Sequence, residues 1–270
     1  MTNKIIWPDQ TGYKPNVINK RMDFVETNMD GLLPISSKEV STLSRYAKKN
    51  NLKLYELISL RHIIRTQKEI DCHKTLCFHI NLIKNKFKGL VENLTKSPNN
   101  LKLIKQFFRN IMMPFYVLLK ILQPTDEYKK LLPAHIDYIM KIKQRMVSME
   151  HDIGYHAKLF EKQLASYLDK TGIPYRTEDD IRRDKDYRVT PDILFNEPVQ
   201  IVVNNTTHMV RWMDAKNYTL VNVPFIMRSL REQAAKYNKI FGPGAFVFHY
   251  GFDTSVKIPD VLILDSSFIV

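Results

Sequence analysis

The feature that most constrains this chain is a pair of strand-like runs between Thr190 and Lys216, joined by a polar turn at residues 204–207. β-Branched, aromatic and aliphatic residues dominate both runs, which predicts two strands of a hairpin-like pair. Because side chains alternate faces along a strand, Asp214 and Lys216 point the same way at the end of the second run. A carboxylate and an ammonium group therefore share one end of an otherwise apolar strand.

A second carboxylate, Asp192, stands at the head of the first run, directly after Pro191. Proline is tolerated at the first position of a strand, where its missing N–H costs no central hydrogen bond. The hairpin would bring Asp192, Asp214 and Lys216 together. Carboxylates hold hard divalent cations, and a neighbouring lysine can steady a hydroxide or a phosphate under attack. The spacing therefore predicts metal-dependent phosphodiester hydrolysis.

This Pro-Asp…Asp-x-Lys pattern is that of restriction-endonuclease-like nucleases, but similar letters also occur by accident. Pro-Asp recurs at residues 8–9 and 259–260, and an acidic-x-Lys triplet recurs at 127–129. Those copies lack the paired strands that the chemistry needs. The alternative for Asp214 and Lys216 is a surface ion pair at a strand end. His208, in phase with Asp214, is a further candidate for orienting a phosphate, or a half-buried strand histidine.

Length and composition bound the class of protein. The 270 residues suffice for one large or two ordinary domains, and 44% apolar with 26% charged residues is typical of a soluble globular protein. No apolar run is long enough to span a membrane, and the N-terminus lacks a signal-peptide pattern. Cys72 and Cys77 make no disulfide framework. We expect an intracellular protein of the nucleus, the cytoplasm or both.

The net charge of +13 is concentrated in the first half of the chain. Residues 1–150 carry 26 Lys+Arg against 13 Asp+Glu, whereas residues 151–270 carry 15 of each. A domain of that balance favours a polyanionic partner, with nucleic acid first and an acidic protein or membrane surface behind it.

The first half divides into an irregular leader over residues 1–35, rich in Pro and Gly, and a helical region over residues 36–147. A capping-box pattern at residues 36–39 begins one helix, Asn50 ends it, and a basic helix follows from Leu54. This pair has the outline of a helix-turn-helix, although a plain helical bundle has the same outline. Further helices are expected over residues 76–94, 101–111 and 115–122.

The second half, residues 148–270, changes pattern. A helix over residues 153–168 precedes strands at 173–175, 191–195, 199–203 and 208–216, a helix at 225–241, and strands at 245–250 and 261–264. The whole chain therefore reads as α+β, with an all-helical region followed by an α/β domain that has a central mixed sheet.

Cys72, Cys77 and His79 are residue types that bind zinc. They lie within one helical stretch, whereas structural zinc sites draw ligand pairs from separate elements. Buried helix cysteines are the alternative, and the sequence leaves the choice open.

Several ordered motifs resemble the TPD family of PD-(D/E)xK nucleases, which includes a codanin-interacting nuclease. The motifs are a stretch beginning Ile153-Gly154 and reaching Glu161, Thr190-Pro191-Asp192, Trp212-Met213-Asp214-Ala215-Lys216, Arg231-Glu232-Gln233, Phe241-Gly242-Pro243-Gly244 and Tyr250-Gly251-Phe252. The resemblance implies a restriction-endonuclease-like domain behind nucleic-acid-binding helices, and an Mg²⁺- or Mn²⁺-dependent enzyme.

Carried over by resemblance, Asp192 would bridge the metals, with Asp214 and the carbonyl of Ala215 as further ligands. Lys216 would be the catalytic lysine. Glu161 would reach the metal through water, and Gln233 would lie near the cleft. The alternatives are a solvated helix glutamate for Glu161, and for Gln233 a residue of the helix surface or one that supports the metal ligands without acting as a catalyst.

Two departures from the family pattern are visible. Asp214 stands where relatives are expected to have Glu, and Asn217-Tyr218-Thr219 replaces a Phe-Gly-Asp-like turn. The implied function is a nuclease acting on nucleic acid, with DNA favoured and RNA possible, and with a codanin-like protein as a possible partner. The alternative is a catalytically silent nucleic-acid-binding or adaptor protein of the same fold.

Overall fold

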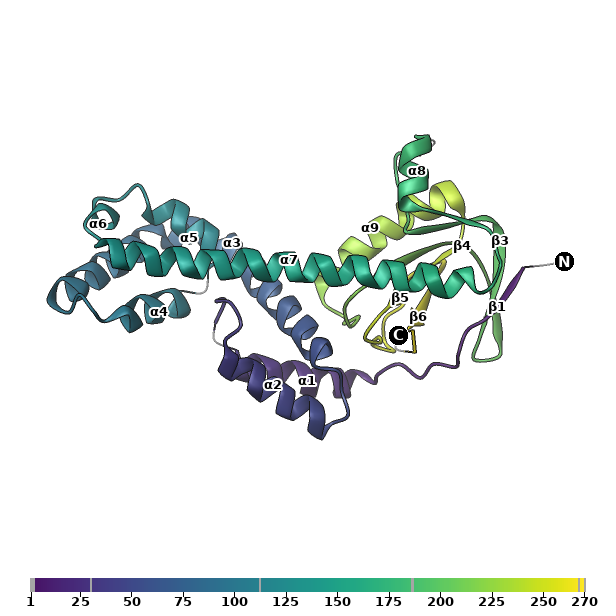
Figure 1. Ribbon diagram of the computed structural model, residues 1–270, viewed down its shortest axis with the longest axis horizontal. Coiled ribbons are helices and arrows are strands. Elements are labelled where there is room, and N and C mark those ends of the chain that lie inside the picture. The colour runs from purple at the N-terminus through teal and green to yellow at the C-terminus, as the bar shows by residue number, and fades with distance from the viewer. Residues whose placement is uncertain (1–2, 30, 112, 186, 267, 270) are drawn as a thin grey trace. The chain divides into compact units, whose positions relative to one another are not determined.

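The computed structural model describes residues 3–29, 31–111, 113–185, 187–266 and 268–269 (Figure 1). The chain divides into two compact units. The sheet unit consists of Met1–Arg21 and Gly154–Val270, and the helical unit of Met22–Ile153. Helices dominate the helical unit and a mixed sheet lies in the sheet unit, which confirms the expected α+β class.

The helical unit contains an apolar core formed by Leu33 and by residues between Ile83 and Met146. Its elements are α1 (Pro15–Asn28, shared with the sheet unit), α2 (Ser37–Lys49), α3 (Leu54–Lys96), α4 (Leu101–Asn110), α5 (Phe115–Leu122), α6 (Asp126–Lys129) and the first part of α7 (Pro133–Asp169). The side chains of Phe87, Ile104, Phe108 and Leu122 are buried together in that core. Ser36 caps α2 by accepting a hydrogen bond from the N–H of Glu39, as the capping box predicts.

The predicted bounds of two helices were wrong, because both helices are longer than expected. The helices expected from Leu54 and over residues 76–94 are one continuous helix, α3. No Gly or Pro lies between them, so nothing interrupts the helical hydrogen-bond ladder. The helix expected over residues 153–168 is the end of α7, which begins at Pro133.

The prediction of an irregular leader over residues 1–35 was wrong as well. Strand β1 (Lys4–Ile6) pairs in parallel with residues 200–202, and α1 buries Ile18 and Val25. The partner of β1 lies almost two hundred positions away, so no local pattern reveals the pairing. The compact units also part at Ile153 and Gly154, inside α7, rather than at the expected residue 148.

The sheet has the strand order β1-β3-β4-β5-β6, with β2 pairing to β3. The remaining elements are β2 (Tyr175–Thr177), α8 (Glu178–Asp184), β3 (Ile193–Val203), β4 (Thr206–Lys216), α9 (Pro224–Phe241), β5 (Gly244–Phe248) and β6 (Val261–Asp265). β3 is antiparallel to β2 and β4, while β4, β5 and β6 run parallel. The sheet is therefore mixed, as expected.

The β3–β4 hairpin that the sequence predicted is present. Asn204 and Asn205 have φ values of 48° and 57°, the left-handed pair that a two-residue hairpin turn requires. The register shifts between Leu194 and Val199, a stretch that contains Pro198. A bulge is one of the few places where a strand accepts proline.

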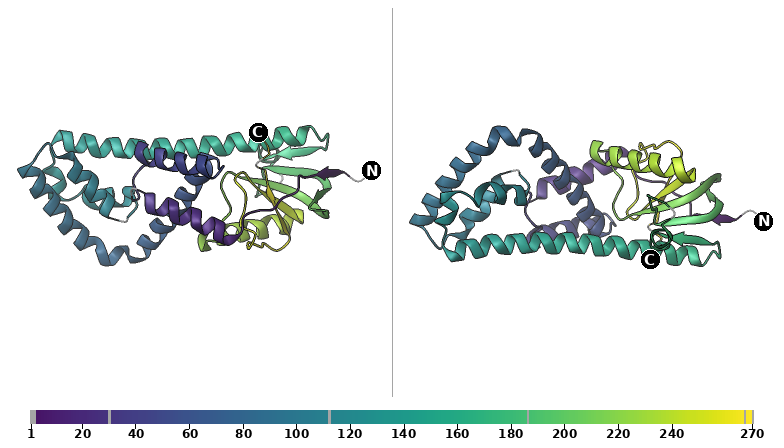
Figure 2. Two further views of the ribbon diagram at one scale, coloured as in Figure 1. Left: turned by 90° about the horizontal axis from the view of Figure 1, so that it is seen from below. Right: turned by 90° about the horizontal axis from the view of Figure 1, so that it is seen from above.

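Helices cover both faces of this sheet (Figure 2). On one face, Phe160 and Leu164 of α7 pack into the core that contains Ile193 and Met213. On the other, the ring of Tyr237 from α9 lies edge-on to Trp212, with ring centroids 5.0 Å apart. Among the described residues, no helix is long and apolar enough to cross a membrane.

Trp212 fixes how β4, β5 and α9 fit together. Its indole N–H donates to the Gly242 carbonyl at 3.0 Å and to the Asn238 side chain at 3.2 Å, and Gly244 lies opposite it in the register. A Cβ added at Gly244 would stand 2.0 Å from the indole ring. Only glycine fits here, because the neighbour is a rigid ring in a buried site.

We therefore expect Gly244→Ala to destabilise the protein by about 3 kcal/mol or more, the upper end for overpacking a core. Thermal unfolding measures this. Gly154→Ala is the matched control, because an added Cβ there meets no described atom within 4 Å and alanine favours a helix. Equal melting temperatures for the two variants would contradict the packing argument.

Candidate active site

The three residues singled out by the hairpin pattern lie together at one end of β3 and β4. Ile193 pairs with Met213, which places Asp192 and Asp214 one step further along the two strands. Asp192 Oδ2 accepts a hydrogen bond from the N–H of Ala215 at 2.7 Å. The sequence prediction of two carboxylates and one lysine at this end is therefore met by the backbone pairing.

Lys216 donates through Nζ to Oδ1 of Asp214. Only 16% of the lysine side chain and 6% of the aspartate side chain are exposed. The ammonium group also lies 5.2 Å from the centre of the Phe246 ring, a cation–π distance. A surface ion pair is thereby ruled out, because both charges lie in the protein interior.

Gln233 of α9 connects the lysine to the carboxylate. Its amide oxygen accepts from Lys216 Nζ at 3.0 Å, and its amide nitrogen donates to Asp214 Oδ2 at 2.7 Å and to the hydroxyl of Tyr237 at 3.0 Å. Both ends of the amide are used, which a carboxylate could not do beside Asp214. Of the two alternatives for Gln233, these contacts contradict an exposed helix-surface residue and agree with a residue that supports its neighbours.

Tyr237 closes the network on the other side. Its hydroxyl lies 3.0 Å from the Thr190 carbonyl and 3.3 Å from Asp214 Oδ2. Burial raises the pKa of this phenol, and the negative charge of Asp214 raises it further. The hydroxyl therefore stays protonated and can donate a hydrogen bond. Its bond to the Thr190 carbonyl holds the backbone two residues before Asp192 in place.

Asp192 is the electrostatically perturbed group of the site. Burial, followed by the charge of Asp214, raises the pKa of this carboxyl from 3.8 to about 8, with a smaller contribution from Glu161. The Ala215 N–H and the charge of Lys216 act in the opposite direction but do not offset the rise. A carboxylate so placed is stabilised by any cation that approaches it.

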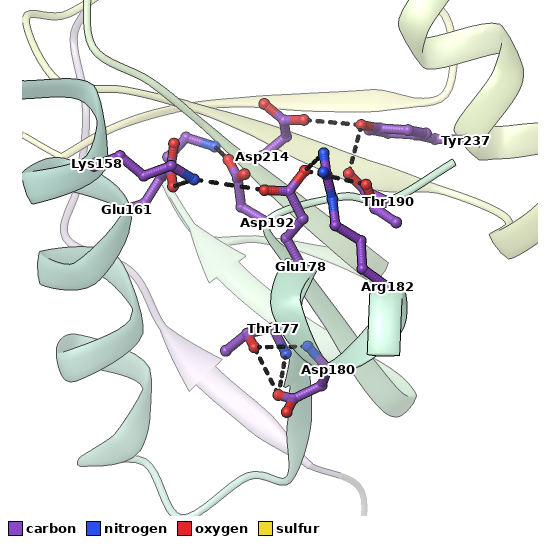
Figure 3. A network of polar contacts seen from close by, with 11 residues as sticks. Lys158, Glu161, Thr177, Glu178, Asp180, Arg182, Thr190, Asp192, Asp214 and Tyr237 are labelled. Atoms are coloured by element: carbon purple, nitrogen blue, oxygen red, sulfur yellow. Dashed lines mark hydrogen bonds and ion pairs between the residues drawn. The ribbon is translucent and has the colours of Figure 1, made fainter. Parts of the chain in front are cut away.

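Glu161 approaches Asp192 from α7 (Figure 3). Its side chain is 26% exposed, and its Oε2 forms an ion pair with Lys158 Nζ at 2.7 Å. It is therefore neither fully solvated nor free of other partners. The placement fits the role that resemblance assigned to it, an acid near the carboxylate pair.

Sequence reasoning missed Glu178, Lys158, Arg182 and Tyr237 as members of this neighbourhood. Glu178 begins α8, and its backbone N–H donates to the Asp192 carbonyl at 3.2 Å. A signal existed for one of them, because Tyr237 is four residues after the candidate Gln233. Residues at that spacing share one face of a helix.

The donor set is of the kind that binds Mg²⁺ or Mn²⁺. A carboxylate offers about four lone-pair positions. Asp192 uses one on Ala215, and Asp214 has Lys216, Gln233 and Tyr237 as neighbours, so oxygen capacity remains, chiefly on Asp192. Across the described residues, no group of three or more His, Cys, Asp or Glu side chains is arranged to hold a metal ion. The carbonyl of Ala215 or water would therefore have to complete a ligand set.

Two other candidates do not join this site. His208 lies six positions before Asp214 on β4, about 20 Å along an extended strand. Cys72 and His79 lie on α3, and the Cys77 side chain lies outside the described residues. The zinc hypothesis for these residues therefore stays open.

Comparison with known proteins identifies the family. The model of the family described as "Protein of unknown function TPD sequence-motif" matches residues 130–267. The chain belongs to the TPD sequence-motif family. An uncharacterized protein of Acanthamoeba polyphaga mimivirus is 39% identical over 264 residues, which is 98% of this chain and 95% of that protein. No solved structure matches the chain.

The TPD match covers all the residues of the candidate site, from Lys158 to Tyr237. The tripeptide of the family's name occurs here as Thr190-Pro191-Asp192. Its threonine carbonyl is a neighbour of Tyr237 and its aspartate is the perturbed carboxyl. The resemblance to the TPD family is confirmed, and the nuclease activity that it implies stays a prediction.

The raised pKa of Asp192 predicts a pH dependence of stability in metal-free buffer. Because the folded-state pKa, about 8, lies above the ordinary 3.8, the folded protein binds this proton more tightly than the unfolded chain. That stabilisation is complete below pH 3.8 and is lost as the pH rises through about 8. Asp192→Asn removes the contribution of this carboxyl to the pH dependence.

The melting temperature of Asp192→Asn should therefore rise relative to wild type across this window. One pKa unit corresponds to about 1.4 kcal/mol, and 1 kcal/mol to roughly 2–4 °C, so a gain above about 4 °C is expected. Asp260→Asn is the control, because Asp260 is exposed and also follows a proline. Parallel curves for Asp192→Asn and wild type would contradict the assignment.

Proposed function

We propose that this protein is a metal-dependent nuclease that hydrolyses phosphodiester bonds of nucleic acid, with DNA the favoured substrate. Its sheet unit would then be a PD-(D/E)xK domain. The observation that carries the proposal is the convergence of Asp192, Asp214 and Lys216 at one end of the β3–β4 pair, with a raised pKa at Asp192. Membership of the TPD family supports it.

In this mechanism Asp192 and Asp214 would hold the cation, and the backbone carbonyl of Ala215, the residue directly after Asp214, would be a further ligand. The chemistry supplied by Mg²⁺ or Mn²⁺ when bound is polarisation of the scissile phosphate and a lower pKa for the attacking water. Asp192 would supply the anionic oxygen, since the Ala215 N–H is the one hydrogen-bond donor to its carboxylate among the described residues. Binding of a cation would return its pKa toward the ordinary range.

Lys216 has a separate task in this proposal. Its Nζ lies between Asp214 and Gln233 and retains one of its three N–H donors for a ligand. That position suits a group that orients a water or offsets negative charge developing on phosphorus. Gln233 is a positioning residue, because it holds Lys216 and Asp214 but no reacting atom.

The helical unit would bind the nucleic-acid backbone. Residues 1–150 carry twice as many basic as acidic side chains, and Lys84, Lys86 and Lys88 of α3 are all exposed. Exposed lysines on a basic helical region are suited to phosphate contacts that do not read sequence.

The first test of the proposal is cleavage. Single-stranded, duplex, flap and junction DNA, and matching RNA, would be incubated with the full chain and Mg²⁺ or Mn²⁺. Asp192→Asn and Asp214→Asn should each slow cleavage by about a thousandfold, equivalent to about 4 kcal/mol in the barrier. Their affinity for the same substrates should change little, because a single carboxylate repels the backbone only weakly.

Asp260→Asn is the matched control and should cut at the wild-type rate, since Asp260 is an exposed aspartate in the same Pro-Asp context. If Asp192→Asn cleaves at the wild-type rate, the site assignment is wrong. Binding without cleavage by the wild-type chain, on every substrate and with either metal, would favour the silent adaptor reading.

The second test separates the lysine from the metal ligands. Because Lys216 occupies Asp214 Oδ1, its removal frees a carboxylate oxygen. Lys216→Ala should therefore bind Mn²⁺ at least as tightly as wild type in calorimetric titration, while cutting roughly a hundredfold more slowly. Lys236→Ala, an exposed lysine of α9, is the control. A loss of Mn²⁺ affinity equal to that of Asp214→Asn would show that Lys216 only supports the carboxylates.

A further inference from the structure

Two exposed cations, Lys158 and Arg182, stand at the rim of the carboxylate pair and are held by Glu161 and Glu178. Lys158 of α7 has a side chain that is 63% exposed. Its Nζ lies 2.7 Å from Glu161 Oε2 and 3.5 Å from Glu178 Oε2. The lysine therefore bridges α7 to the start of α8.

Arg182 stands on the other side of Glu178. Its side chain is 65% exposed, and its Nη2 donates to Glu178 Oε1 at 2.7 Å. The Thr190 hydroxyl donates to the same oxygen at 3.1 Å. Burial raises the pKa of the Glu178 carboxyl, but the donors Arg182 and Thr190 outweigh it and hold the pKa below the ordinary value. Glu178 is therefore an ionised anchor with a cation on each side (Figure 3).

This rim is attached directly to the candidate active site. The N–H of Glu178 donates to the carbonyl of Asp192 at 3.2 Å, and Lys158 lies one helical turn before Glu161. Thr190, which anchors Glu178, is two residues before Asp192. The backbone hydrogen bond from Glu178 to Asp192 thus fixes the acid that holds both cations. Lys158 is also fixed by its place on α7, three residues before Glu161.

We propose that Lys158 and Arg182 bind the phosphates that flank the scissile bond, and that Glu178 is the positioning residue that holds both cations in place. The proposal rests on the proposed nuclease function and names the substrate-binding residues of the same site. A nucleic-acid backbone approaching Glu161 and Asp214 meets negative charge. Cations at the rim offset that repulsion.

The chemistry of the two side chains fits phosphate. An arginine has five N–H donors in a planar fork, and within the described part of the chain Arg182 commits one of them, through Nη2. Lysine has three donors, and among the described residues the ionic partners of Lys158 are Glu161 and Glu178, so a donor remains for a phosphate. Charge-assisted bonds to phosphate oxygens are among the strongest hydrogen bonds in proteins.

A small probe tests this without involving the basic helices. The 5′-phosphorylated dinucleotide of thymidine is too short to need them, so its affinity for the full chain, in EDTA, reports on the rim. Lys158→Ala and Arg182→Ala should each weaken binding roughly tenfold, as expected for loss of one charge-assisted contact. The control variants Arg183→Ala and Lys170→Ala, which remove other exposed cations of the sheet unit, should change it less than about twofold.

Glu178→Gln separates substrate binding from simple charge compensation. If Arg182 only neutralised Glu178, adding Arg182→Ala to Glu178→Gln would have no effect on binding, and the inference would fail. We expect a further loss of at least about fivefold, because the arginine contacts the probe itself. In cleavage assays the same variants should raise KM about tenfold and change kcat less than about threefold.

The outcomes also distinguish this inference from the proposed function. If the wild-type chain cleaves nucleic acid, but Lys158→Ala and Arg182→Ala have the same dinucleotide affinity and KM as the control variants, the phosphate-binding inference alone is overturned. Dinucleotide binding that depends on both residues, without cleavage of any substrate, would keep the phosphate site and reject the nuclease. No dinucleotide binding by the wild-type chain overturns the inference.

Discussion

The placement of two carboxylates at one buried strand end is the constraint on which this site depends. An ionised carboxylate loses its hydration there, and a second one nearby adds repulsion, which is why the pKa of Asp192 rises to about 8. Asp214 is even less exposed, and it is tolerated because Lys216, Gln233 and Tyr237 supply donors to it. Asp192 has fewer hydrogen-bond donors than Asp214 to stabilise its ionised form. A bound cation would therefore stabilise the ionised form of Asp192 most.

The scaffold explains why these donors stay in place. Gln233 and Tyr237 lie on α9, and α9 is fixed to the sheet where Trp212 bonds to Asn238 and Gly242. The absence of a side chain at Gly244 lets β5 lie against that indole ring. The Gly242-Pro243-Gly244 motif is thus a packing requirement. Its effect reaches Asp214 through Gln233 and Tyr237 of α9.

The hairpin and its site residues could be predicted because the information is local. Alternation along the strand places Asp214 and Lys216 on one side, and the Asn204–Asn205 turn brings Asp192 beside them. The α9 helix, the strand before it and the parallel strand after it also follow from local periodicity. The position of Gln233 was available only from the resemblance to the family.

Other parts could not be read locally. β1 is a three-residue strand whose partner is β3, and only the fold shows that pairing. The uninterrupted length of α3 depends on the absence of a stop signal, which short windows do not reveal. Glu178 entered the site because the N–H that follows β2 bonds to the carbonyl before β3, a contact between segments with no shared motif.

The central claim is that Asp192 and Asp214 together hold a divalent cation used in phosphodiester hydrolysis. Crystals of the full chain soaked with Mn²⁺, measured at a wavelength where manganese scatters anomalously, test it most directly. The account predicts an anomalous peak within about 2.0–2.3 Å of an oxygen of both carboxylates, and no such peak in Asp192→Asn. A manganese peak confined to other parts of the chain, or none at saturating Mn²⁺, would contradict it.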